Sequence, residues 1–199
     1  MKLIGLLLFL TPLLSIAQSN EGLTDICYIE NSEIVILGTS NVTDYSCKLF
    51  DLSNNSCIKI SSTIYGKKIK LENAIITLDA NGFNCDNELI TRDFYKAIKG
   101  DEFPKIMVQF HEFTLVNEVA DSPTQENVPY QLSINLAGET NNYSSKLKSL
   151  EVTQDQLTIS GRVDLLMTDF NIVPPSALFG TIKTSNEISI DFLITFTFK

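Results

Sequence analysis

The sequence predicts an all-β fold, an antiparallel β-barrel of about eight strands with one short helix in a long connection. The main observation is that apolar and polar residues alternate with a period of two along most of the chain, which is the pattern of half-buried strands. Two of these alternations run for ten or more residues, longer than a typical strand and suited to a tall barrel. One segment has its apolar residues at helical spacing instead.

The two longest alternations lie in the last quarter of the chain. The C-terminal one places six apolar residues on one face: Ile188, Ile190, Phe192, Ile194, Phe196 and Phe198. The preceding one has a similar face: Leu157, Ile159, Gly161, Val163, Leu165 and Met167. From these faces alone, a lumen filled by side chains and a lumen that holds one ligand are both open.

Shorter strands are expected before these two, and a polar loop with two prolines at residues 117–129. The expected strands are residues 24–30, 33–38, 44–51, 56–64, 67–79, 105–116 and 131–137. Between Phe110 and Phe113 the alternation changes phase, which indicates a β-bulge near His111. Residues 51–56 (Asp-Leu-Ser-Asn-Asn-Ser) predict the tip of a hairpin that joins two of the strands.

Residues 87–100 predict the single helix. Leu89 or Ile90 begins a helical spacing that continues through Phe94, Ala97 and Ile98. Gly100 follows as the predicted stop signal.

The first 17 residues predict a secretory signal. Lys2 precedes an apolar run that ends in small residues, Ser15 and Ala17, so cleavage is expected after Ala17. The run is short for a membrane span and contains Pro12. The remaining 182 residues, 18–199, predict one exported domain, periplasmic or secreted.

The charge of the exported part restricts its partners. Loss of Lys2 with the signal leaves 14 basic and 24 acidic residues, a net charge of −10. Nucleic acids and anionic membranes are bound through cationic faces, so we expect neither a nucleic-acid partner nor stable membrane insertion. The oligomeric state stays open, a dimer included.

Four cysteines follow the predicted signal: Cys27, Cys47, Cys57 and Cys85. An even count in an exported protein predicts two disulfides, with three connectivities open. A hairpin at residues 51–56 could bring Cys47 opposite Cys57. The spacings match no Cys-x-x-Cys pair, so we expect no metal and no cofactor.

The sequence argues against an enzyme and predicts no catalytic residue. Its one histidine, His111, lies in a predicted strand whose phase points it outward. There is no Gly-x-Ser-x-Gly motif and no glycine loop for phosphate. Acidic residues are plentiful, but no pair stands out for glycoside chemistry.

Three collinear stretches resemble the YceI-like family of exported bacterial proteins, in a Bacteroidetes-type variant. Residues 37–45 (Leu-Gly-Thr-Ser-Asn-Val-Thr-Asp-Tyr) are similar to its G-T-S-x-x-H-D-W opening, with Thr43 for His and Tyr45 for Trp. Residues 92–106 are similar to its helix-to-strand passage, and residues 166–188, with a Pro-Pro turn, to its closing hairpin. The four cysteines are not a general feature of the family.

The resemblance implies a lipocalin-like barrel that encloses an amphiphilic, isoprenoid-like lipid without chemistry. Its Pro-Pro turn would carry residues 177–179 beside the barrel mouth. The ligand-binding residues expected on this basis are Phe94, Tyr95, Phe103, Phe110, Leu178, Phe179, Phe192, Ile194 and Phe196. The alternative is an envelope-stress or protein-interaction barrel with a filled core and no ligand.

Overall fold

The computed structural model describes most of the chain after the predicted signal. It covers residues 20–28, 32–49, 52, 58–65, 67–119, 121–177 and 179–198, and for residues 20–28, 58–65, 177 and 198 it describes the backbone path. The predicted signal, Cys57 and Leu178 lie outside the described residues.

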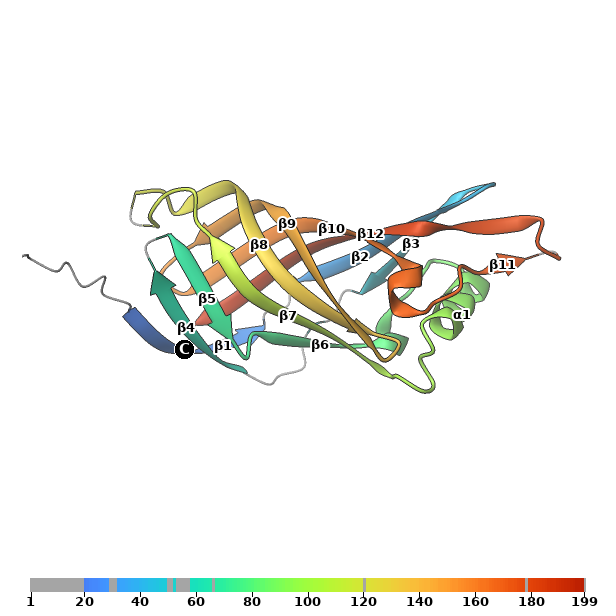
Figure 1. Cartoon of the computed structure of the whole chain (residues 1–199), viewed down its shortest axis with the longest axis horizontal. Coiled ribbons are helices and arrows are strands. Elements are labelled where there is room, and N and C mark those ends of the chain that lie inside the picture. The colour runs from blue at the N-terminus through green and yellow to red at the C-terminus, as the bar shows by residue number, and fades with distance from the viewer. Residues whose placement is uncertain are drawn as a thin grey trace, which may run out of the picture.

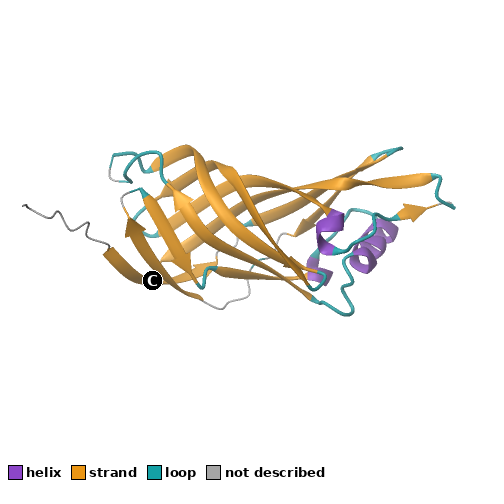
Figure 2. Ribbon diagram, in the orientation of Figure 1, coloured by secondary structure: helices purple, strands orange, loops and turns teal. Residues whose placement is uncertain are grey.

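The described chain is mostly antiparallel sheet with one α-helix, as predicted (Figures 1 and 2). The strands are β1 (Asn20–Tyr28), β2 (Glu33–Ser40), β3 (Asp44–Leu49), β4 (Ile58–Tyr65), β5 (Lys68–Glu72), β6 (Ile75–Asp79), β7 (Lys105–Thr114), β8 (Thr124–Leu136), β9 (Glu139–Val152), β10 (Gln156–Leu166), β11 (Ser176–Ala177) and β12 (Ile182–Phe198). The helix is α1 (Glu88–Ala97), and two short 3₁₀ turns are η1 (Ala80–Gly82) and η2 (Met167–Phe170). No helix in these ranges is long and apolar enough to cross a membrane.

Several of the shorter strands follow one another along a common partner. Strands β1 and β2 pair in succession with the same edge of β12, and β5 and β6 pair in succession with β7. Strand β3 pairs with β2, and β4 pairs with β1. At the break between β1 and β2, the buried hydroxyl of Ser32 accepts a hydrogen bond from the Thr195 N–H of β12 at 3.0 Å. The arrangement is therefore eight strand positions around a barrel, three of them occupied by two strands in line.

The two ends of this barrel close differently. At the closed end, defined by β1, β4 and β5, the pairing continues from β12 through these strands to β7. At the open end, defined by β2, β3 and β6, no pairing between β3 and β6 is found in the described chain, so the sheet is not closed there. The two edges are joined instead by a backbone bridge between Lys48 and Asn84 (N···O 2.7 and 2.9 Å) and by a disulfide between Cys47 and Cys85.

This arrangement overturns the predicted hairpin at residues 51–56 and the pairing of Cys47 with Cys57. Strands β3 and β4 pair with different partners and are not paired with each other. The partner of Cys47 is Cys85, which follows η1 far along the chain. The backbone of Cys27 lies in β1, and Cys57 lies outside the described residues.

The predicted bulge near His111 is confirmed, because the register of β7 against β8 shifts between Phe110 and Glu112. The predicted loop at residues 117–129 is too long, since β8 already begins at Thr124 and contains Pro129. Pairing of β7 with β8 ends at Tyr130, so Pro129 lies where its missing N–H disrupts no ladder to β7.

Strand β9 was not predicted. It has no continuous apolar face, and only Leu147 and Leu150 on it are buried apolar residues. A two-residue turn of Ala137 and Gly138, both at positive φ (52° and 86°), joins β8 to β9.

The predicted helix is confirmed. The side chain of Asn87 caps it by accepting hydrogen bonds from the Leu89 and Ile90 N–H groups at 2.9 and 3.3 Å. The left-handed residue after its C-cap is Lys99 (φ 55°), not Gly100. Gly100 is needed one position later, because a Cβ there would lie 2.1 Å from the Tyr95 ring.

The predicted apolar faces of β10 and β12 point into the barrel over the side chains that the structure describes, and Phe198 is not among these. At the closed end the interior is filled by side chains with at most 2% exposure: Val128, Tyr130, Leu147, Leu150 and Ile159. The filled core predicted as one alternative therefore occupies this half of the lumen.

The disulfide is expected to stabilise the open end. Removing it in the double variant Cys47→Ala, Cys85→Ala should lower the free energy of unfolding by about 3–4 kcal/mol, because the bond closes a long loop in the unfolded chain. Urea denaturation followed by circular dichroism measures this. The variant Ser46→Ala on the same strand is the control, and an unchanged midpoint in the double variant would contradict the prediction.

Candidate ligand-binding cavity

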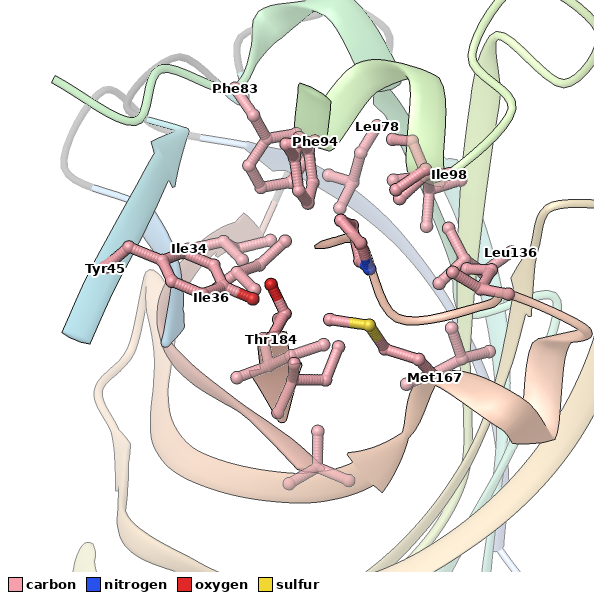
Figure 3. Close-up of a pocket in the computed structure, with 18 of the residues that line it drawn as sticks. Ile34, Ile36, Tyr45, Leu78, Phe83, Phe94, Ile98, Leu136, Met167 and Thr184 are labelled. Atoms are coloured by element: carbon pink, nitrogen blue, oxygen red, sulfur yellow. The ribbon is translucent and has the colours of Figure 1, made fainter. Parts of the chain in front are cut away.

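The open end of the barrel contains a cavity of about 320 Å³ (Figure 3). Its walls come from β2, β3, β6, β7, β8, β10, β12 and α1. Most of the lining side chains are apolar, and Asp93 is the one charged residue among those that the structure describes. Apolar pockets of this size, with a few polar groups, are typical of small-molecule sites.

The floor of the cavity is aromatic. Phe110 and Phe192 line it, with ring centroids 6.2 Å apart in an edge-to-face arrangement. Tyr130 lies at 6.0 Å from Phe192 and 6.2 Å from Phe110, and Phe113 lies at 5.6 Å from Phe110. These rings separate the cavity from the filled closed end.

A glycine makes room for this floor. Gly161 on β10 faces Phe192 across the strand pair, and a Cβ at position 161 would lie 2.6 Å from the Phe192 ring. The tip of the ring therefore packs against β10 in the space that a side chain would fill.

Tyr130 carries the one hydroxyl among these four rings. The hydroxyl donates a hydrogen bond to the Arg162 carbonyl at 3.0 Å. Burial raises the pKa of Tyr130 to about 12. The phenol therefore stays protonated, as its donor role requires.

Helix α1 lies at the open end of the barrel (Figure 1), and its Phe94 borders the cavity (Figure 3). Its residues Ile90, Phe94 and Ala97 line the cavity, as does its C-cap residue Ile98. Phe94 packs against Phe83 from the segment after η1, with ring centroids 5.5 Å apart. The mouth of the cavity is formed by the turn between β2 and β3 and by the start of β12.

Four of the residues predicted to bind a ligand are brought together here: Phe94, Phe110, Phe192 and Ile194. The remaining described ones do not line the cavity. Phe196 is buried at the closed end, where it pairs with Tyr28, and Phe179 is fully exposed. Tyr95 packs over Gly100, and the Phe103 ring packs over Gly138. Leu178 lies outside the described residues.

The sequence-based set missed the aliphatic walls and the mouth. The alternation of residues 33–38 could have identified Ile34 and Ile36, which line the cavity from β2. The stretch 37–45, which carries the family resemblance, also contributes lining residues at the mouth: Ser40, Val42, Thr43 and Tyr45.

Residues outside the cavity offer no assembled metal site in the described chain. His111 does not line the cavity, and its Nε2 lies 3.0 Å from the Ser133 hydroxyl. The described geometry is that of a container with an apolar interior.

The ionisation of Tyr130 gives a prediction for alkaline pH. A raised folded-state pKa means that its contribution to stability is complete below pH 10 and is lost as the pH rises toward about 12. At pH 11 this loss should be about 1.4 kcal/mol. Unfolding of the protein and of Tyr130→Phe in urea between pH 9 and 11 measures it. The free energy of unfolding should fall less steeply with pH in Tyr130→Phe than in the unmodified protein. Equal slopes in the two proteins would contradict the raised pKa of Tyr130.

The fold can be compared with known proteins now that its geometry is established. No family model and no curated protein matches the chain. A polyisoprenoid-binding domain from Saccharophagus degradans shares the fold, with a TM-score of 0.56, 8% identity, and coverage of 88% of this chain and 98% of that one. Burkholderia cenocepacia BcnA also shares the fold, with a TM-score of 0.55, 7% identity, and coverage of 82% of this chain and 95% of that one.

A Campylobacter jejuni YCEI protein aligns over 100% of this chain and 94% of that one, at 10% identity and a TM-score of 0.47. At these identities the likeness concerns the fold. The chain therefore has the barrel fold of the polyisoprenoid-binding domain and of BcnA, in agreement with the YceI-like barrel that its three sequence stretches predicted.

Proposed function

We propose that this protein binds one amphiphilic lipid, with an isoprenoid-like apolar chain, inside the open end of the barrel and performs no chemistry on it. The observation that carries the proposal is the apolar cavity of about 320 Å³ above a closed aromatic floor. A protein-interaction barrel needs no such space, because its interior gains stability from complete packing.

The lining determines what the cavity can hold. A ligand that buries roughly 300 Å² of apolar surface would gain about 7 kcal/mol from leaving water, before the entropic costs of binding. Among the described residues that line the cavity there is no lysine or arginine, and Asp93 is the one charged side chain. An anionic headgroup would have no cation to pair with there, so the proposed ligand is uncharged.

The comparisons and the sequence add support to the ligand class and the location. A protein with the same fold is described as polyisoprenoid-binding, which favours a branched apolar chain over a straight one. The signal-like first 17 residues and the disulfide between Cys47 and Cys85 favour export to an oxidising compartment such as the periplasm.

Filling the cavity should abolish lipid binding and leave the fold intact. The variant Ala97→Trp places an indole from α1 into the cavity, and Lys96→Trp on the exposed helix face is its matched control. Farnesol is a suitable uncharged probe, followed by native mass spectrometry and by calorimetry. Ala97→Trp should bind it at least tenfold more weakly, while the control keeps the original affinity.

Protein purified from its own host supplies a second readout. Organic extraction followed by mass analysis should yield a co-purifying lipid from the unmodified protein and from Lys96→Trp, and little from Ala97→Trp. Empty protein in all three cases, together with no affinity for farnesol, would support the protein-interaction alternative instead.

A further inference from the structure

The cavity mouth contains an aromatic residue that reaches across a neighbouring strand. Tyr45 of β3 lies opposite Gly38 of β2. A Cβ at position 38 would lie 2.2 Å from both Cζ and the hydroxyl oxygen of Tyr45. The ring can cross β2 because residue 38 has no side chain, and a strand glycine of this kind marks a close approach.

This crossing brings the Tyr45 hydroxyl toward a second hydroxyl. Thr184 lies on β12, the strand on the other side of β2, and pairs there with Ser40. Both Tyr45 and Thr184 line the cavity, and their hydroxyl oxygens point into it (Figure 3). Two polar groups from separate strands thus converge on an otherwise apolar space.

The remaining hydroxyls of the mouth differ in their surroundings. The Ser40 hydroxyl donates to the Thr43 carbonyl at 2.8 Å, and the Thr43 hydroxyl donates to the Asp44 carbonyl at 3.1 Å. Ser176 is exposed to solvent. For Tyr45 and Thr184, both partly buried, no side-chain hydrogen bond is found within the described part of the chain.

Burial raises the pKa of Tyr45, so this phenol remains a donor at neutral pH. A hydroxyl that lacks a protein partner in an apolar environment favours a ligand that supplies one. Each of the two hydroxyls can donate or accept. Carbonyl and alcohol oxygens match both roles, whereas a hydrocarbon end matches neither.

We propose that Tyr45 and Thr184 form a polar clasp that selects ligands with an uncharged, oxygen-bearing headgroup, an alcohol or a carbonyl, at the mouth of the cavity. The headgroup lies between the two hydroxyls, and the apolar chain extends toward the floor of Phe110 and Phe192. This inference rests on the proposed lipid-binding function and adds a headgroup class and two specificity-determining residues to it.

Three probes with the same farnesyl chain test the clasp: farnesol, the hydrocarbon farnesene and farnesyl diphosphate. The unmodified protein should bind farnesol about fivefold more tightly than farnesene, the ratio expected of one net hydrogen bond. Tyr45→Phe and Thr184→Val remove one oxygen each at nearly constant volume. Each should reduce the preference for farnesol while leaving the affinity for farnesene unchanged. Ser46→Ala, which removes a hydroxyl of β3 that does not line the cavity, should leave both affinities unchanged.

The outcomes separate this inference from the function on which it rests. If no probe binds, the proposed lipid binding fails and the clasp fails with it. If farnesol and farnesene bind equally, or if Tyr45→Phe and Thr184→Val keep the full preference, lipid binding stands and the clasp is overturned. Tightest binding of farnesyl diphosphate would overturn the uncharged headgroup class. Circular dichroism of each variant confirms that the fold is retained.

Discussion

Strand β12 is the element on which the rest of the barrel depends. One of its edges pairs with β10, while its other edge passes from β1 to β2. Between β1 and β2, the Thr195 N–H of β12 donates its hydrogen bond to the Ser32 hydroxyl instead of to a neighbouring strand. This exchange of partners allows one long strand to belong to a closed ring at one end and to an open-sided container at the other.

Glycines set the shape of the cavity inside that frame. Gly161 admits the Phe192 ring against β10 and so fixes the floor, while Gly38 admits the Tyr45 ring across β2 and narrows the mouth. In each case an aromatic ring occupies the space that a side chain on the facing strand would take. The depth of the cavity therefore depends on Gly161, and the width of its mouth depends on Gly38.

Local patterns predicted the parts of the fold that local physics determines. Alternation identified β10 and β12 because each has one apolar face, and helical spacing identified α1. Strand β9 was missed because both its faces are largely polar. The partner of Cys47 could not be read from spacing, because β3 and β4 are not paired with each other in the described chain. The bond instead joins β3 to the segment after η1, and these two segments meet only in the folded barrel.

The site residues were also predicted only where a local sequence pattern determines their position. The predicted ligand residues were mainly aromatic. On the barrel wall Phe110 and Phe192 line the cavity but Phe196 does not, and Tyr95 and Phe103 pack over Gly100 and Gly138. Which aromatic residues cover turns and which face the lumen depends on three-dimensional register, which a one-dimensional pattern cannot give.

The division of the lumen into a filled half and a hollow half also separates two kinds of evolutionary constraint. In the filled half, trimming a side chain such as Leu147 or Ile159 creates a void where none existed, and the protein loses stability in proportion. Around the hollow half, a side chain already borders empty space, so a change of size there reshapes the container with a smaller cost to folding. Substitutions around the hollow half can therefore alter the shape of the cavity while the filled half beneath the aromatic layer keeps the barrel folded.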